Sequence, residues 1–212
     1  TVTTSESLPF GKYELTAAAS IIADEAGNSL ADRFSFTFTS YDVDDDTAIW
    51  ISDTNGDWND AGNWLDSRVP LSGQDVFIDR IGIDVEVTIS TGTVQVGQGT
   101  VNETLRLTGS TLIVDGPEAS LQADGLLSAQ NAAIKVLNGG TLNAPNLTTV
   151  NHTIFTISGV SHFHTPSLSN ADHSRFLLSG GAIYALPVTT YAATDLGFSA
   201  VLFRADGAGT IL

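Results

Sequence analysis

Apolar residues in the second half of the chain recur at a constant interval of 21 positions. A repeat of this length fits one coil of a solenoid, in which three short strands are joined by turns and each strand pairs in parallel with strands of the neighbouring coils. The repeating apolar sets are Leu121, Leu142, Phe163 and Tyr184; Leu105, Leu126, Leu147 and Leu168; Ile113, Ile134, Phe155 and Phe176; and Val136, Ile157 and Leu178.

The same interval separates three prolines, which are tolerated at corners because a missing N–H costs no ladder hydrogen bond there. We therefore predict an all-β fold in which residues 80–212 form a right-handed parallel β-helix, with the apolar sets directed into its core. The interval is irregular between Val96 and Leu105, which predicts a bulged loop on an early coil. The three prolines are Pro145, Pro166 and Pro187.

Residues 1–46 show a different pattern, in which apolar and polar residues alternate. Tyr13 to Ala17 alternates as a strand does, and three phenylalanines alternate with Ser and Thr from Phe34 to Phe38, which predicts a strand with one buried aromatic face. The pattern is Gly11-x-Tyr13-x-Leu15, then Asp24-x-Ala26-Gly27-Asn28-x-Leu30, then Phe34-x-Phe36-x-Phe38. It resembles the last strands of bacterial immunoglobulin-like domains. The resemblance implies a partial Ig-like β-sandwich segment without the early strands of such a domain.

Residues 47–79 contain all three tryptophans, Trp50, Trp58 and Trp64. This segment contains the motifs Gly56-Asp57-Trp58, Asn63-Trp64, Pro70 and Asp75-Val76-Phe77-Ile78-Asp79. They resemble the segment that opens β-helical stalks in large bacterial surface proteins, including autotransporter-like ones. Large aromatic side chains hide the apolar core and the unpaired strand edges that an open end of a β-helix exposes. We therefore expect this segment to be an aromatic cap.

The charge balance narrows the range of partners. Lys and Arg number 8 against 24 Asp and Glu, so the net charge is −16, which repels nucleic acid and anionic lipid. No apolar run approaches the length of a membrane span, so no membrane insertion is expected in this segment. Cysteine and methionine are absent, and we expect both ends to continue into a longer chain. The resemblances imply a secreted protein at the cell surface.

Two groups of acidic residues are candidate calcium ligands. The run from Asp53 through Asn55 to Asp57 places oxygen ligands at alternate positions, as at the start of a calcium loop. It departs from an EF-hand, because Trp58 occupies the glycine position. The acidic run that includes Asp42, Asp44 and Asp46 offers further ligands at the junction of two segments. The alternatives are an ordinary Asn-Gly turn and a solvated acidic linker.

All four histidines lie between residues 152 and 173. His162 and His164 flank Phe163 of an inward set, so both should point outward, where such a pair chelates a transition metal. The alternative is two solvated histidines, since no third ligand is evident. His152 and His173 are 21 positions apart and should stack on neighbouring coils, with Asn131 in the equivalent place.

Many β-helices act on polysaccharides, which makes acidic pairs candidates for catalysis. Only Glu103 and Asp124, near Arg106, come together in the predicted register, and two solvated acids at a corner explain them better than a catalytic pair does. We therefore predict a non-enzymatic structural or adhesive module of a large extracellular bacterial surface protein. Its expected partners are copies of itself, neighbouring domains or surface glycans. The alternative is a carbohydrate-active or carbohydrate-binding β-helix.

Overall fold

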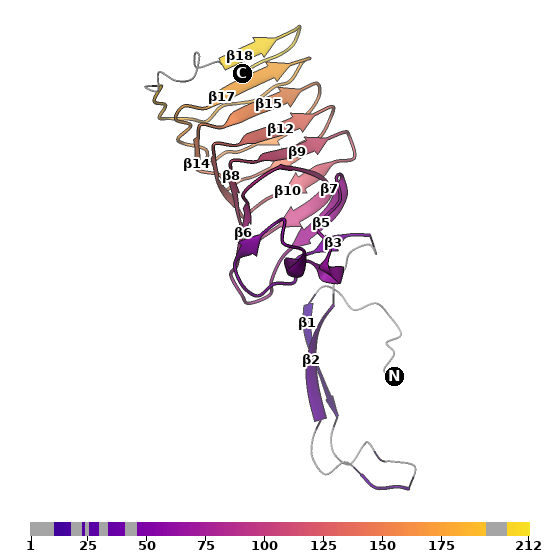
Figure 1. Cartoon of the computed structure of the whole chain (residues 1–212). Coiled ribbons are helices and arrows are strands. Elements are labelled where there is room, and N and C mark those ends of the chain that lie inside the picture. Colours follow the sequence, from indigo (N-terminus) through magenta and orange to yellow (C-terminus); the bar gives the residue numbers. More distant parts are fainter. Residues whose placement is uncertain (1–10, 18–22, 24–25, 30–33, 41–45, 194–202) are drawn as a thin grey trace. The chain divides into compact units, whose positions relative to one another are not determined.

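The computed structural model describes the chain except for residues 1–10, 18–22, 24–25, 30–33, 41–45 and 194–202 (Figure 1). Two compact units form, Thr1–Asp45 and Asp46–Leu212. Within the described part, helix is limited to two short 3-10 turns, η1 (Ala61–Asn63) and η2 (Leu65–Ser67), and no helix there has the length and apolar character needed to cross a bilayer.

The first unit contains one antiparallel pair, β1 (Gly11–Ala17) with β2 (Phe34–Ser40). The register sets Tyr13 opposite Phe38, and their rings stack with centroids 5.7 Å apart. Both strands were predicted, but the buried aromatic face was not correct. Phe36 is 45% exposed and Phe38 is 37% exposed, because no second sheet among the described residues covers this face of the ribbon.

The second unit is a parallel β-solenoid of about five turns, which confirms the predicted solenoid. Its strands form three walls, which we name A, B and C. Wall A contains β9 (Thr111–Asp115), β12 (Ala133–Leu137), β15 (Ile154–Ser158), β17 (Arg175–Ser179) and β18 (Phe203–Asp206), which rise in steps towards the C-terminal end in Figure 1. Wall B contains β3 (Ala48–Ile49), β5 (Gln74–Ile78), β10 (Ser120–Gln122), β13 (Thr141–Asn143) and β16 (His162–His164). Wall C contains β4 (Gly56–Asp57), β6 (Glu86–Ile89), β8 (Thr104–Thr108), β11 (Leu126–Gln130) and β14 (Thr149–Asn151).

One long strand, β7 (Thr93–Val101), belongs to both wall A and wall B. Its first part pairs with β9, and its second part pairs with β5 and β10. The bulged loop predicted between Val96 and Leu105 is therefore largely a strand that continues around a corner. Hydrogen bonding along β7 joins walls A and B into one sheet of eleven strands.

The core is built from the predicted apolar sets in the later coils. Leu142 pairs with Leu121 and Phe163, and Phe155 pairs with Ile134 and Phe176, all of them buried. These partners are related by the constant interval found in the sequence. Such stacking fills the interior without interruption and removes large apolar side chains from water.

One member of the predicted sets is wrong. Ile113 pairs with Lys135 and faces outward, and its neighbour Leu112 is the buried residue that pairs with Ile134. The step from Leu112 to Ile134 is one position longer than the constant interval. A shift of one residue reverses which side chains of a strand face the core, so the constant interval selected the wrong neighbour.

The segment with the three tryptophans forms the first layer of the solenoid. β3 pairs with β5, and β4 pairs with β6, so backbone hydrogen bonds tie this segment to the coils that follow. Trp50, Trp58 and Trp64 are at most 2% exposed and belong to the same core as the later coils. Trp64 meets the other two edge to face, with ring centroids 5.3 and 4.8 Å away. The predicted boundary at residue 80 thus lies within the second unit.

Candidate functional site

The histidine stack forms one corner of the solenoid. The rings of His152 and His173 lie 4.5 Å apart and within 9° of parallel, as predicted. Asn131, His152 and His173 have φ values of 49°, 48° and 57°, and Gly109 at the corner before them has 62°. Left-handed backbone is tolerated best by Gly, with Asn and His enriched among the other residues. The residue types at this corner therefore follow from its backbone conformation.

The other two histidines lie on the outer face of wall B. His162 and His164 are exposed on either side of the buried Phe163, as predicted. Their neighbours in β13 are Thr141 and Asn143. Among the described residues, no group of three or more His, Cys, Asp or Glu side chains is placed to hold a metal ion. A transition metal on this pair stays a prediction.

The candidate calcium group from Asp53 to Asp57 joins the first layer to the next one. Asp53 forms an ion pair with Arg80, and the Asn55 Oδ1 atom accepts a hydrogen bond of 2.8 Å from the backbone N–H of Glu86. Asp57 accepts one from the hydroxyl of Ser90. These oxygen atoms thus have partners in the following coil and act as links between layers.

The pKa of Asp57 reflects these contacts. Partial burial of its carboxyl favours the neutral form and would raise the pKa. Hydrogen bonds from the Ser90 hydroxyl and the Asn59 backbone N–H stabilise the charged form more strongly, so the pKa lies below its usual value. A carboxylate that stays charged is a better acceptor for both donors.

The candidate calcium group of Asp42, Asp44 and Asp46 is described only in part. Asp42 and Asp44 lie outside the described residues. Asp46 begins the second unit, and its carbonyl oxygen accepts a hydrogen bond of 2.6 Å from the Gln74 side chain. Calcium at this junction therefore stays a prediction.

Glu103 has a role that the sequence did not reveal. Its side chain is buried, and its two carboxylate oxygens accept hydrogen bonds of 2.7 and 3.0 Å from the backbone N–H groups of Arg80 and Val85. The carboxylate thereby closes the turn between these two residues. Glu103 stands between Asn102 and Thr104, so the sequence around it gives no sign that its carboxylate is buried and held by partners.

The candidate acidic pair is not arranged as two free carboxylates. Asp124 accepts a hydrogen bond from the side chain of Gln122, and Arg106 forms an ion pair with Glu86. Next to Asp124, Gly125 packs so closely on the backbone of Glu103 that an added Cβ would lie 1.5 Å from the Glu103 carbonyl oxygen. The register brings the backbones of Glu103 and Gly125 together. The side chains of Glu103 and Asp124, in contrast, bond to different partners.

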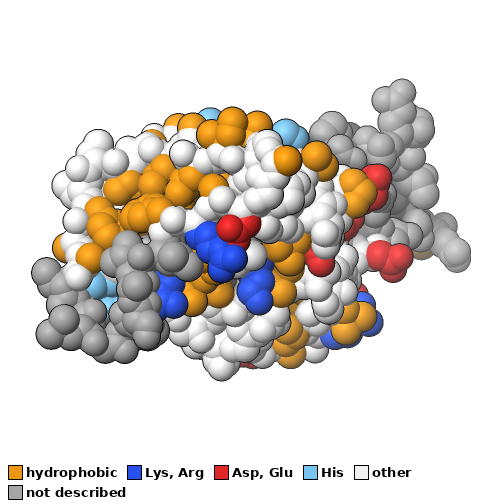
Figure 2. All heavy atoms as spheres, turned by 90° about the horizontal axis from the view of Figure 1, so that it is seen from above, with side chains coloured by type: hydrophobic (Ala, Val, Ile, Leu, Met, Phe, Trp, Pro, Cys, Tyr) orange, Lys and Arg blue, Asp and Glu red, His pale blue; other side chains and the backbone are white. Residues whose placement is uncertain are grey.

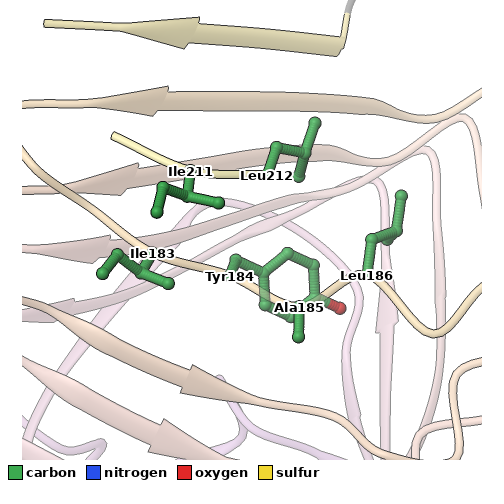
Figure 3. Close-up of a pocket in the computed structure, with 6 residues that line it drawn as sticks. All are labelled: Ile183, Tyr184, Ala185, Leu186, Ile211 and Leu212. Atoms are coloured by element: carbon green, nitrogen blue, oxygen red, sulfur yellow. The ribbon is translucent and has the colours of Figure 1, made fainter. Parts of the chain in front are cut away.

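An apolar recess of about 570 Å³ lies at the last coil (Figure 3). The hydroxyl of Tyr184 is buried there and hydrogen-bonds the Thr165 hydroxyl at 2.6 Å. Burial of the tyrosine raises its pKa to about 12, and the bond to Thr165 only partly offsets this effect. Ile183 and Ile211 are more than half exposed. The recess is lined by Ile183, Tyr184, Ala185, Leu186, Ile211 and Leu212.

Comparison of the chain with protein-family models, with curated proteins and with solved structures finds no match.

Proposed function

We propose that this chain is a non-enzymatic structural module of a large secreted surface protein. The observation that carries the proposal is the continuous buried stack of the solenoid, in which every wall is joined to the next coil by a parallel ladder. Such a stack resists bending because each inner coil is hydrogen-bonded along its strands to the coil on either side. Residues that could have supplied chemistry, including Glu103 and Asp57, support the proposal because they link one coil to another.

The first layer has a defined part in this proposal. Its three buried tryptophans seal the N-terminal end of the stack as an aromatic cap. The ribbon β1–β2 represents the end of an Ig-like domain that joins the module to its neighbours. We further propose that the protein is secreted and lies at the cell surface, where it contacts copies of itself or surface glycans.

Small-angle X-ray scattering of the purified chain tests the structural role. A stable solenoid gives the same dimensions in low and in high salt, because buried stacking is insensitive to screening. A collapse or expansion of the second unit between these conditions would contradict the proposal.

Activity assays on acidic and neutral polysaccharides test the enzymatic alternative. We expect no cleavage. Asp124→Asn is the informative variant, since Asp124 bonds to its neighbour Gln122 and its loss leaves the turn held by Glu103 intact. Cleavage that is abolished by Asp124→Asn would overturn the proposal in favour of catalysis.

Thermal unfolding with calcium and with chelator tests the predicted ion. An ion bound only by the folded chain raises the melting temperature as its concentration rises. If calcium binds at the junction, the combined variant Asp42→Asn and Asp44→Asn removes the increase, while Asp53→Asn leaves it in place because Asp53 pairs with Arg80. Equal melting temperatures with calcium and chelator would remove calcium from the proposal.

A further inference from the structure

Three polar side chains come together on the outer face of wall B, where β16 lies beside β13. His162 and His164 are exposed on either side of the buried Phe163. Side chains two positions apart on a strand point to the same face, and their Cα atoms are about 6.6 Å apart. In the neighbouring strand, Asn143 pairs in register with His164. The two imidazoles and the amide of Asn143 therefore share one face of two adjacent strands.

The amide oxygen of Asn143 points to a ligand at this place. The amide nitrogen donates a hydrogen bond of 2.8 Å to the side chain of Gln122 in β10, on the other side of β13. The Oδ1 atom is on the opposite branch of the amide and is therefore turned towards β16. It is buried, and no described residue donates a hydrogen bond to it. A buried acceptor without a donor costs free energy, so this atom requires a partner.

The donor atoms suit a divalent transition metal. Imidazole nitrogens bind Zn²⁺, Cu²⁺ and Ni²⁺ well, at about 2.0–2.1 Å for zinc, and oxygen ligands bind zinc at a similar distance. Calcium prefers ligand sets made of oxygen atoms and would gain little from two imidazoles. Two histidines and one amide oxygen thus favour a transition metal over calcium.

The surroundings of the histidines favour a cation. The chain has a net charge of −16, which attracts positive ions. The strands β10, β13 and β16 contain no Lys or Arg that would repel an ion here. Figure 2 shows histidine side chains at the surface, among hydrophobic and uncharged side chains. An ion can therefore reach such side chains from solvent, and water can fill the coordination positions that the protein leaves open.

The stacked histidines of the corner do not offer the same arrangement. The rings of His152 and His173 are within 9° of parallel, with centroids 4.5 Å apart. The nitrogen lone pairs lie in the ring planes, so those of two parallel rings do not converge on one ion. The pair in β16 is therefore the better candidate of the two.

We propose that His162, His164 and the Oδ1 atom of Asn143 together bind one divalent transition metal ion on the outer face of wall B. The ion joins β13 to β16 and adds a link between two coils whose backbones are already paired. An ion that binds only the folded chain adds to the stability of the fold. The inference goes beyond the proposed function, because the solenoid is continuous without the ion.

Isothermal titration calorimetry of the purified chain with Zn²⁺, in a buffer that does not bind zinc, tests the site. We expect one tightly bound ion per chain. His162→Ala and His164→Ala should each weaken binding about tenfold or more. Thr141→Ala is the matched control, because Thr141 pairs with His162 on the same face. The double variant His152→Asn with His173→Asn is a second control, since Asn accepts the left-handed backbone of that corner. Both controls should bind zinc as the unmodified chain does.

Two substitutions of Asn143 distinguish a ligand from a purely structural amide. Asn143→Asp keeps an oxygen atom and loses the amide nitrogen that bonds to Gln122, whereas Asn143→Leu removes both. If the oxygen is a ligand, Asn143→Asp should bind zinc at least as tightly as the unmodified chain, and Asn143→Leu should bind it about tenfold more weakly. Circular dichroism melts without zinc show whether each variant is folded.

Hydrogen exchange tests the link between the coils. The backbone N–H of Ala144 donates a hydrogen bond of 2.9 Å to the carbonyl oxygen of His164, next to the site. Zinc should slow exchange of this N–H about tenfold, because opening the two coils then requires loss of the ion. The N–H of Asn131, which bonds to the carbonyl of Asn151 at another corner, should exchange at the same rate with and without zinc.

Three results would overturn the site: no tight binding of zinc, an affinity that survives His162→Ala and His164→Ala together, or equal affinities in Asn143→Asp and Asn143→Leu. A water molecule that serves Asn143 in place of an ion predicts the first result. The structural role is tested by scattering without zinc, so these results overturn the metal site and leave that role standing.

Discussion

The coils before and after residue 125 are held together in different ways. In residues 46–125 the number of positions between two paired residues varies. It is smaller than the constant interval from Val94 to Leu112 and larger from Val76 to Gly99. Acidic and amide side chains link these coils, as Glu103 does. Between residues 126 and 179 the paired residues follow the constant interval, whereas the step from Phe176 to Phe203 is longer. Stacked aromatic rings occupy the core of these coils, with Phe155 and Phe176 4.6 Å apart.

This difference shows that a solenoid can tolerate irregular coil lengths where polar side chains close its turns. Glu103 supplies acceptors to two backbone N–H groups that the irregular turn leaves without ladder partners. Where the coils are uniform, the ladder pairs the backbone groups of each strand, and packing can hold the coils together. Substitutions and changes of pH should affect the two kinds of coil differently, with the largest loss of stability in the regular coils.

Phe155→Ala should cause the largest loss of stability. Phe155 is fully buried and contacts the rings of both Phe176 and Phe163, so its removal leaves a cavity in the regular coils and costs about 3–5 kcal/mol. Denaturant unfolding measures the loss. Thr156→Ala, outward on the same strand, should change stability by less than about 0.5 kcal/mol. Similar values for the two variants would show that the aromatic stack does not hold these coils together.

Alkaline pH should loosen the regular coils. The folded pKa of Tyr184 is raised from 10.0 to about 12, so the folded chain retains a proton that the unfolded chain releases. The stabilisation is fully present below pH 10 and is lost as the pH rises towards 12, by about 2–3 kcal/mol. Denaturant midpoints across this range measure the loss. Tyr184→Phe should remove this slope, and an unchanged slope in the variant would assign it to another group.

Glu103→Gln should destabilise the irregular coils by about 2 kcal/mol, because a neutral amide has one oxygen acceptor in place of two charged ones. One of the N–H groups of Arg80 and Val85 then loses its partner. Hydrogen exchange at these two amides should accelerate. The exposed Glu118→Gln is the matched control and should leave exchange unchanged. Protection that persists in Glu103→Gln would show that the turn closes without the carboxylate.

Acid should produce the smallest effect, confined to the first layers. The pKa of Asp57 is lowered from 3.8, so its stabilisation is present above this pH and is lost as the pH falls through the lower folded value. Because the carboxyl is only partly buried, the loss should stay below about 1 kcal/mol. Asp57→Asn should reduce the acid sensitivity of exchange near Ser90. Loss of protection first at β15 or β17 would contradict the division into two modes.

The sequence predicted the regular coils well because their ladders are uniform. Equal spacing identified Leu121, Leu142 and Phe163 as stacked core residues, and the same spacing placed His152 over His173. It failed at Ile113, where one extra residue in the coil reverses the two faces of the strand. A constant repeat interval cannot predict that one coil is a residue longer than the others.

The links between the first layers could not be predicted for a related reason. Asn55 bonds to the backbone of Glu86, and Asp53 pairs with Arg80, and no repeat in the sequence connects the members of either pair. Acidic residues at alternate positions resemble a calcium loop in sequence, whatever their partners are in space. The register of β4 on β6, which sets Gly56 beside Val87, brings Asn55 next to Glu86.

The left-handed corner at Asn131, His152 and His173 has a consequence for how this chain could evolve. Each corner residue adopts the same backbone conformation at the same point of its coil, so a segment from one corner to the next is an interchangeable cassette. A gene duplication that copied one such segment as a whole would add a coil whose ends already match its neighbours. A duplication of a different length would move other residues to the corner. A β-branched residue there would be strongly disfavoured, because it rarely adopts left-handed backbone. The corner therefore sets the unit in which such a protein can gain or lose length.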